Sequence, residues 1–302
     1  MIMIHRFRLT ALFAFMICCQ AFAQTTDHLR EKIQQIISSK NAEVGVAIKS
    51  PDGRDTLSIN GNLHFPLQSV FKFHIALAVL SQVDQGKFSL NQKIKIGKKD
   101  LLPDLYSPIR DRYPNGVTLP LSKILEYTVS QSDNVGCELL LKMISGPEAV
   151  EKYCKDSGVK DISIKINEET QQANWDLQFL NWTTPKAGNE ILELFYVNAN
   201  KLLSKKSYDF IWKVMRETET GENRLRGQLP KTTVVAHKTG SSGANKEGLT
   251  AAVNDMGIVF LPNGKHYFIT VFVTKSMENA ETNEKIIADI SKAAWDYFNT
   301  KK

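Results

Sequence analysis

Strand patterns lie near both ends of this 302-residue chain, and helical patterns fill the segment between them. Near the start, apolar residues alternate over residues 44–48, and a turn containing Gly and Asp leads to a second strand over residues 56–59. Near the end, residues 256–275 show the pattern of a hairpin that turns at Pro262-Asn263-Gly264. The two ends of the chain are therefore expected to build one antiparallel sheet, which the intervening residues leave and rejoin.

Apolar residues recur at helical spacing at both termini and through the middle of the chain. The terminal helices are expected around residues 29–37 and 282–298. The middle segments with this pattern are residues 71–82, 121–129, 135–143, 147–156 and 186–198. The expected fold class is therefore α/β (α+β), with an antiparallel sheet flanked by the terminal helices and a separate all-helical lobe.

The order of these patterns divides the chain into two lobes. Residues 24–65 and 210–302 are expected to form a discontinuous α/β lobe, and residues 66–209 a helical lobe. A cleft between two such lobes is where a small-molecule site is expected.

Residues 1–23 have the layout of a secretory signal peptide. A short basic start precedes an apolar run, and Ala21-Phe22-Ala23 supplies a small-x-small cleavage site. The run is shorter than the roughly twenty residues that a membrane span needs, and no later segment is long and apolar enough for one. We expect cleavage after Ala23, export to the periplasm and no membrane attachment afterwards.

Cys137 and Cys154 remain after cleavage and lie on either side of a turn at Gly146-Pro147. They could face each other across a helical hairpin and oxidise after export, or stay as two buried free thiols. No CxxC, HxH or HExxH pattern is present, so neither a metal ion nor another cofactor is expected. His74 and His237 are expected to pack or to form hydrogen bonds.

The charge of the chain gives little support to nucleic-acid binding. The formal net charge is +6, and the lysines are scattered rather than clustered. No interface pattern appears either, so a monomer with a small-molecule partner is expected.

The segment LQSVFKFHIALAVL places a serine and a lysine at the start of a strongly apolar helix. Positions i and i+3 share a helix face, so the Lys72 ammonium can lie beside the Ser69 hydroxyl. A lysine placed there can help to deprotonate the serine, which then becomes a nucleophile. The same spacing recurs at Ser157 and Lys160, but Gly158 follows that serine and no apolar helix comes after it. The first copy is therefore the candidate, and the second serves as a decoy.

Two further motifs follow along the chain. Ser132-Asp133-Asn134 precedes a helical segment, where all three residue types are also good helix caps. Lys238-Thr239-Gly240, followed by Ser241, comes after a strand. It can offer a cation, hydroxyls and backbone amides to an anionic substrate, or it can simply lead into a turn. Neither motif decides the function alone.

SxxK before an apolar helix, then SDN, then KTG on a strand, is the motif set of class A β-lactamases and penicillin-binding proteins. Over essentially its whole length after residue 23, the chain resembles a class A serine β-lactamase. The likeness is closer to the PER-type extended-spectrum branch, in FPLQSVFKFHIALAVL, ILEYTVSQSDNVGC and VVAHKTGSSG. The resemblance implies the two-lobe serine β-lactamase/DD-peptidase-like fold and a β-lactam substrate.

The resemblance also implies a role for each motif residue. Ser69 resembles the acylated nucleophile, and Lys72 its proton partner. Ser132 is similar to the serine that passes a proton to the lactam nitrogen, and Asn134 to the residue that holds the substrate's side-chain amide. The residues that resemble the site for the substrate carboxylate are Lys238, Thr239, Gly240 and Ser241.

Three further parts of the site are implied in the same way. Arg224 resembles the arginine that supports carboxylate binding in this branch, although Arg226 lies close by and both could be solvated surface charges. Tyr106 resembles the aromatic gatekeeper of the cleft, the alternative being a half-buried loop tyrosine. The family's oxyanion hole would consist of the backbone N–H groups of Ser69 and Ser241.

The polar stretch INEETQQANW, within an expected active-site loop over residues 163–182, carries two adjacent acids. In the family, the glutamate that activates the deacylating water lies 36 residues after the serine of SDN, which selects Glu168 over Glu169. Glu169 replaces the usual proline. Gln172 replaces the usual asparagine, and its amide can still hold a water. A loop unlike the common one, and a roomier cleft for oxyimino-cephalosporins, are therefore implied.

Three activities stay open on these grounds. A secreted β-lactamase would acylate and deacylate, and it would confer resistance to penicillins and cephalosporins. A penicillin-binding DD-peptidase would be trapped by the antibiotic, and a sensor domain would acylate and hold it. The register of Glu168 favours the first, because deacylation needs a carboxylate within one water of the acyl carbonyl.

Overall fold

The computed structural model describes residues 26–198 and 201–300, and its centre is a five-stranded antiparallel sheet with the strand order β2-β1-β10-β9-β8. The expected pairing of the two ends is confirmed, since Val44 of β1 lies opposite Val273 of β10. The expected hairpin is also confirmed: β9 and β10 pair on either side of Gly264, whose φ of 80° favours glycine. The strands are β1 (Glu43–Lys49), β2 (Thr56–Ile59), β8 (Val235–Ser241), β9 (Thr250–Phe260) and β10 (His266–Ser276). The segment expected as a signal peptide lies outside the described residues.

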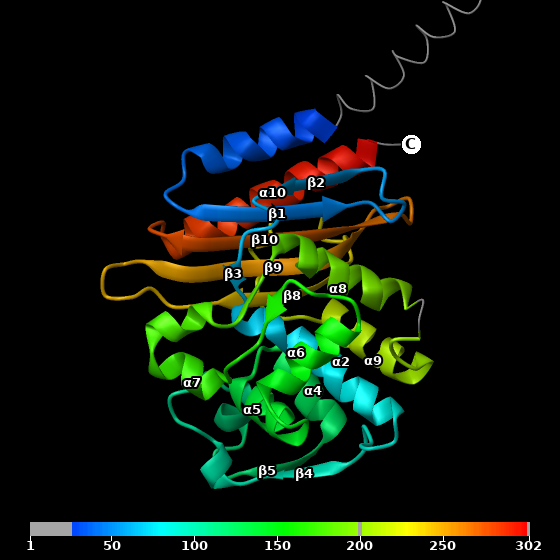
Figure 1. Ribbon diagram of the computed structural model, residues 1–302, viewed down its shortest axis with the longest axis vertical. Helices are drawn as coiled ribbons and strands as arrows, with labels where there is room; N and C mark the ends of the chain where they lie inside the picture. Colours follow the sequence, from blue (N-terminus) through cyan, green and yellow to red (C-terminus); the bar gives the residue numbers. More distant parts are fainter. Residues whose placement is uncertain (1–25, 199–200, 301–302) are drawn as a thin grey trace, which may run out of the picture.

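Both faces of the sheet are covered by helices, and the alternation of side chains along β10 feeds two different cores. Tyr267 and Ile269 pack with the helix over residues 26–38 and with α10, while Phe268 and Phe272 pack on the opposite face with α8. Figure 1 shows the terminal helices on one side of the sheet and the helical part of the chain on the other. Figure 1 labels two of the helices that pack on the sheet, α8 (Pro185–Val197) and α10 (Ala280–Thr300).

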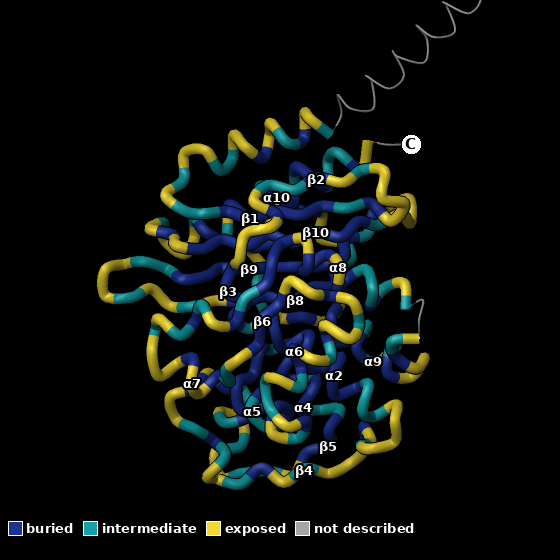
Figure 2. Tube along the Cα trace, in the orientation of Figure 1, coloured by how far each residue is buried: buried dark blue, intermediate teal, exposed yellow. Residues whose placement is uncertain are grey.

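The helical part of the molecule is built around α2. Its residues from Phe71 to Leu80 are all buried, which suits a helix that is apolar on every side. Helices α4, α5, α6 and α9 pack around it, and Figure 2 shows this region as the buried interior of the lower part of the molecule. The elements of this part are β3 (Phe65–Pro66), η1 (Gln68–Val70), α2 (Phe71–Asp84), β4 (Lys93–Ile96), η2 (Lys98–Asp100), α3 (Pro108–Arg112), β5 (Val117–Pro120), α4 (Leu121–Ser130), α5 (Asn134–Met143), α6 (Pro147–Asp156), β6 (Ile162–Ser163), α7 (Glu168–Ala173), η3 (Trp175–Phe179), β7 (Trp182–Thr183) and α9 (Lys205–Arg216).

Some of these elements were not predicted from the sequence. The hairpin of β4 and β5 was missed although Lys93–Ile96 alternates between polar and apolar residues, a signal that was present in the sequence. Helix α9 carries Ile211 and Met215 on its buried face at helical spacing, a signal that was present in the sequence. Because α9 packs on α2 and α4 and contains residue 209, we propose that the helical lobe extends to the end of α9.

Cys137 and Cys154 are two buried free thiols, the second of the two alternatives that the sequence left open. Helices α5 and α6, which carry them, each pack against α2. Burial raises the pKa of the Cys154 thiol to about 12. Within the described ranges, no helix combines the length and apolarity that crossing a bilayer requires.

Candidate active site

Ser69 lies in η1, directly before α2, with its side chain only partly buried. The i+3 geometry expected for the SxxK motif is present, since Lys72 Nζ donates a hydrogen bond to Ser69 Oγ over 2.7 Å. Lys72 itself is fully buried. The decoy is different: the Ser157 hydroxyl is bonded to the Tyr153 carbonyl at the end of α6, and Lys160 is exposed. The structure thus brings only the first serine and lysine together.

The Lys72 ammonium is also surrounded by oxygen atoms from three other residues, two of them in the SDN segment. Glu168 Oε1 lies 2.7 Å from Nζ, and the Ser132 carbonyl oxygen lies 3.0 Å from it. Asn134 Oδ1 also accepts a hydrogen bond from Nζ. Glu168 is 2% exposed, so this is a buried ion pair, and the hydrogen bonds from Lys72 to Ser69, Ser132 and Asn134 offset part of the cost of burying the ammonium.

The SDN segment works both as a helix cap and as a supplier of site residues. Asp133 caps α5 by accepting from the Gly136 N–H, and its other oxygen accepts from the Ser107 hydroxyl and the Ile109 N–H. Ser132 has a φ of 61°, a left-handed conformation that costs a residue other than glycine about 1–3 kcal/mol. The cap therefore holds a strained turn, and this turn brings Ser132 and Asn134 to Lys72.

Strand β8 brings a second buried ammonium to the same turn. Lys238 Nζ donates to Ser132 Oγ over 3.1 Å and to the Thr239 carbonyl over 2.8 Å. Burial lowers the pKa of Lys238 well below its ordinary value, and the positive charge of Lys72 lowers it further. Ser132 therefore lies between two lysines, with its carbonyl on one and its hydroxyl on the other.

The rest of the KTG segment contacts the nucleophile segment on one hand and Thr220 and Arg224 on the other. A side chain at Gly240 would place its Cβ 2.7 Å from the Leu67 carbonyl oxygen, so only glycine allows this close approach of β8 to η1. Thr239 Oγ1 lies 2.5 Å from Thr220 Oγ1. Ser241 is exposed, and its hydroxyl accepts from Arg224 Nη2 over 2.7 Å.

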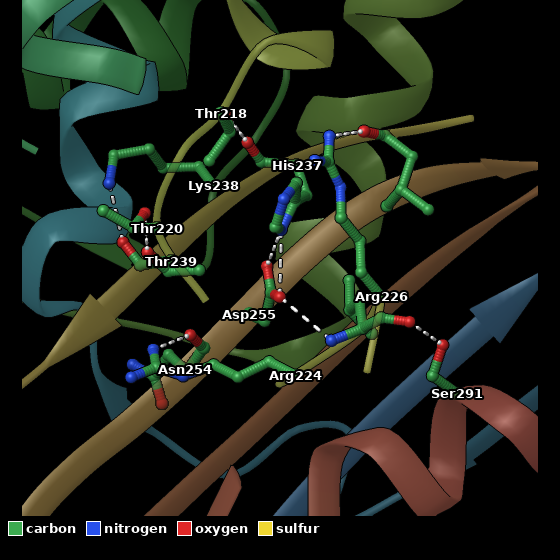
Figure 3. Close-up of polar contacts among 12 residues, drawn as sticks. Thr218, Thr220, Arg224, Arg226, His237, Lys238, Thr239, Asn254, Asp255 and Ser291 are labelled. Carbon is green, nitrogen blue, oxygen red and sulfur yellow. Dashed lines mark hydrogen bonds and ion pairs between the residues drawn. The ribbon is translucent and has the colours of Figure 1, made fainter. Parts of the chain in front are cut away.

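The two arginine candidates have different positions, as Figure 3 shows. Arg224 is 8% exposed and donates to the carbonyls of Gly240 and Asn254 as well as to Ser241. Arg226 instead donates to two backbone carbonyls, those of Arg216 and Val235. Arg224 therefore contacts the carboxyl-terminal end of β8, where the KTG segment lies, whereas Arg226 contacts the first residue of that strand.

His237 and Asp255 form a fully buried pair on neighbouring strands, also seen in Figure 3. His237 Nδ1 lies 2.9 Å and 3.0 Å from the two Asp255 oxygens, one of which also accepts from the Leu225 N–H. The His237 carbonyl accepts from the Thr218 hydroxyl. As expected, this histidine is a hydrogen-bonding residue, and it ties β8 to the segment that carries Arg224.

Asp255→Ala is expected to lower the free energy of unfolding by about 3 kcal/mol, because it leaves two buried N–H donors without an acceptor. The measurement is urea unfolding followed by circular dichroism. Asp209→Ala is the control: it removes an exposed ion pair with Lys205 and should change stability by less than about 1 kcal/mol. Equal losses in the two variants would contradict the role given to the buried pair.

The polar stretch that contains the two adjacent glutamates is a short helix, α7, and not an open loop. Its N-cap Asn167 accepts from the Thr170 N–H and donates to Glu138 Oε2. Glu138 Oε1 accepts from the N–H groups of both Glu168 and Glu169. Because successive helical residues point in different directions, Glu168 is buried beside Lys72 while Glu169 is exposed.

Gln172, the residue expected to hold a water in this loop, lies beside a second glutamine whose surroundings are different. Gln172 is exposed, whereas Gln171 is buried and donates its Nε2 to Gln68 Oε1 over 2.8 Å. The spacing counted from the family places the amide four residues after Glu168. In the structure, however, α7 begins at Glu168 and its buried face passes through the i+3 position. Gln171, and not Gln172, is therefore the amide that faces the nucleophile segment.

Tyr106 lies at the margin of the cluster. Its side chain is 58% exposed, and its carbonyl accepts from the Asn134 N–H over 3.0 Å. The structure therefore places this tyrosine next to Asn134, with the ring open to solvent. Within the described residues, no group of three His, Cys, Asp or Glu side chains is arranged to hold a metal ion.

Several residues that shape this site were missed in the sequence. Glu138 lies four residues after Asn134 on the same helix face, so helical spacing could have suggested it. Thr220 and Gln178 carry no such signal, since only the tertiary packing brings them to Thr239 and Gln68.

Known proteins similar to this chain are β-lactamases. The pattern described as "Beta-lactamase enzyme family" matches residues 28–298. The chain is 54% identical to Beta-lactamase VEB-1 of Pseudomonas aeruginosa over 99% of both proteins. It is 44% identical to Extended-spectrum beta-lactamase PER-1 of the same organism, over 91% of this chain and 88% of that one.

A solved structure agrees with these relatives. A representative of class A β-lactamase from Bacteroides cellulosilyticus superposes with a TM-score of 0.87 at 38% identity, covering 92% of this chain and 99% of that one. The resemblance recognised in the sequence is thereby confirmed, together with the fold that it implied. The chain belongs to the class A β-lactamase family and is a hydrolase that acts on β-lactams.

Proposed function

We propose that the chain hydrolyses the β-lactam amide through an acyl-enzyme on Ser69, which water activated by Glu168 then cleaves. One observation carries this proposal: the Lys72 ammonium lies 2.7 Å from Ser69 Oγ and 2.7 Å from Glu168 Oε1. The nucleophile and the carboxylate thus share one proton carrier. A proton passed from Lys72 to Glu168 leaves a neutral amine beside the serine hydroxyl, which that amine can deprotonate.

Acylation forms the bond between Ser69 Oγ and the lactam carbonyl carbon and breaks the bond from that carbon to the ring nitrogen. The ring nitrogen needs a proton as it leaves. Ser132 Oγ is the proposed donor, and Lys238, 3.1 Å away, stabilises the alkoxide character that develops on it. The backbone N–H groups of Ser69 and Ser241 are the proposed oxyanion hole.

In deacylation, water is the nucleophile and Ser69 is the leaving group. Glu168 takes a proton from a water molecule, the water oxygen attacks the ester carbon, and the proton returns to Ser69 as the ester bond breaks. Because Glu169 is exposed whereas Glu168 is buried against Lys72, we assign the base to Glu168 alone.

Substrate recognition is assigned to the surrounding polar groups. Thr239 and Ser241, with Arg224 behind them, are proposed to hold the substrate carboxylate, assisted by Lys238. Asn134 and Tyr106 are proposed to contact the acylamino side chain. PER-1 is named an extended-spectrum β-lactamase, and we propose the same range, with oxyimino-cephalosporins, for this chain.

We also propose secretion to the periplasm, through a cleavable signal at residues 1–23, and action there as a monomer that confers β-lactam resistance. The support is the basic and apolar pattern of that segment.

Sustained turnover of a chromogenic cephalosporin by the purified protein is the expected result, because a carboxylate is in place for deacylation. The measurement is absorbance against time at a substrate concentration far above that of the enzyme. A burst of one equivalent followed by no steady state would contradict the proposal and would indicate a protein that is only trapped by the antibiotic.

A further inference from the structure

Three buried glutamines form a continuous chain of hydrogen bonds next to the nucleophile. Gln171 Nε2 donates to Gln68 Oε1 over 2.8 Å, and Gln68 Nε2 donates to Gln178 Oε1 over 2.8 Å. Gln178 Nε2 in turn donates to the Trp175 carbonyl over 3.0 Å. The exposed fractions are 2% for Gln68, 3% for Gln171 and 7% for Gln178, so water does not compete for these bonds.

The chain of amides joins two parts of the catalytic machinery that are far apart in the sequence. Gln68 directly precedes Ser69, while Gln171 lies in α7, the short helix that begins at Glu168, and Gln178 lies in η3, which follows it. Gln68 has a φ of 47°, a strained conformation that persists only where the surroundings hold it. Both ends of its side-chain amide are held by the segment that carries Glu168.

The backbone just before Ser69, residues 66–68, is also held by the sheet, and we call it the nucleophile turn. Asn254 Nδ2 donates to the Pro66 carbonyl over 2.7 Å and to the Leu67 carbonyl over 3.3 Å, and Gly240 packs directly against the same backbone. The turn is therefore fixed to the sheet independently of the glutamines. What the glutamines add is the position of the 168–178 segment relative to that turn.

The ion pair with Lys72 does not by itself supply this position. It keeps a Glu168 oxygen near Nζ, but the deacylating water must fit between the carboxylate and an ester carbon on Ser69. A misplacement of about 1 Å can cost about 100-fold in such a step. Glu138 holds the start of α7 to α5, and the glutamines hold the following turns to the nucleophile.

We propose that Gln171 and Gln178 are positioning residues which, through Gln68, set the distance between Glu168 and the acyl group on Ser69, and that they act mainly on deacylation. The inference rests on the roles proposed above for Ser69 and Glu168. Acylation depends less on the glutamines, because Ser69, Lys72, Ser132 and Lys238 contact one another without them.

Gln171→Met tests the proposal, since methionine keeps the length and volume of the side chain but donates no hydrogen bond. Stopped-flow bursts give the acylation rate, and the steady state gives the deacylation rate. We expect deacylation to slow about tenfold or more and acylation to change less than about threefold. The KM should then fall together with kcat, because acyl-enzyme accumulates. The control is Gln85→Met, the same change at an exposed glutamine that follows the end of α2, which should match the unchanged enzyme.

A purely structural defect would lower the burst amplitude, which counts active molecules, and would leave the rate constants unchanged. The double variant Gln68→Met/Gln171→Met tests whether the two glutamines act through one shared hydrogen bond. If they do, its deacylation rate should be no lower than that of the slower single variant. Gln178→Met provides the same test by a second route if Gln171→Met does not fold.

Deacylation within about twofold of the unchanged enzyme in a folded Gln171→Met protein, or an equal loss of acylation, would overturn the inference. Its failure is distinct from failure of the proposed function. If Glu168→Ala traps an adduct while Gln171→Met deacylates normally, only the glutamine inference is wrong. If Glu168→Ala traps no adduct, the proposed function is wrong as well.

Discussion

Replacing Ser69 by alanine is expected to lower kcat for every β-lactam by at least about 10⁴-fold. The hydroxyl is the only atom of this side chain that can form the ester, and no other hydroxyl lies at the same distance from Lys72 among the bonds that the structure describes. The variant should fold normally, because Ser69 is only partly buried and its Oγ accepts a single hydrogen bond from Lys72. Initial rates on a chromogenic cephalosporin, with circular dichroism of both proteins, check the expectation.

The second SxxK motif supplies a matched control for this variant. Ser157→Ala and Lys160→Ala alter the same two residue types at the same spacing, but at the end of α6 and away from the cluster. Both should keep the full rate. A large loss in either of them, or substantial turnover by Ser69→Ala, would show that the motif has been assigned to the wrong helix.

Glu168→Ala is expected to lower the deacylation rate by about 10³-fold while acyl-enzyme still forms. No other carboxylate in the described structure contacts Lys72, so the ester on Ser69 loses its general base. Absorbance traces should show a burst of about one equivalent, slowed because Lys72 has lost the carboxylate that accepts its proton, and then almost no turnover. A slow approach to steady state without a burst would place the main effect of Glu168 on acylation instead.

Stability gives an independent check on the same variant. Removing one partner of a buried ion pair usually costs about 3–5 kcal/mol, because the remaining charge is left without compensation. Here the Ser132 carbonyl and Asn134 still accept from Lys72, so the loss should fall below that range. Complete unfolding of Glu168→Ala would contradict this account of the ammonium's surroundings.

The sequence predicted those parts of the fold that depend on local periodicity. Helix α6 has the bounds that were expected, Pro147–Asp156, because Pro at its start and Gly158 after its end are strong local signals. The sheet was predicted from alternation in β1 and β10. The strands β4 and β5 were missed, because residues 97–116 separate them and no short turn marks them as a hairpin, as the turn before the equally short β2 does.

Spacing along the chain predicted the residues that lie on helices and strands better than those on irregular segments. Ser69 and Lys72 share a helix face, so their contact follows from the i+3 rule. The choice between Gln171 and Gln172 depends on where α7 begins, which is set by Asn167 and the distant Glu138. The choice between Arg224 and Arg226 depends on packing against β8 and β9, which no local pattern contains.

The central claim is that Glu168, and not its neighbour, deacylates an ester on Ser69. Intact-protein mass spectrometry after mixing with a cephalosporin tests it most directly, with Glu168→Ala and Glu169→Ala as a matched pair. Glu168→Ala should show a stable mass increase that maps to the peptide containing Ser69, while Glu169→Ala should return to its free mass like the unchanged enzyme. A stable adduct on Glu169→Ala alone, or on neither variant, would contradict the account.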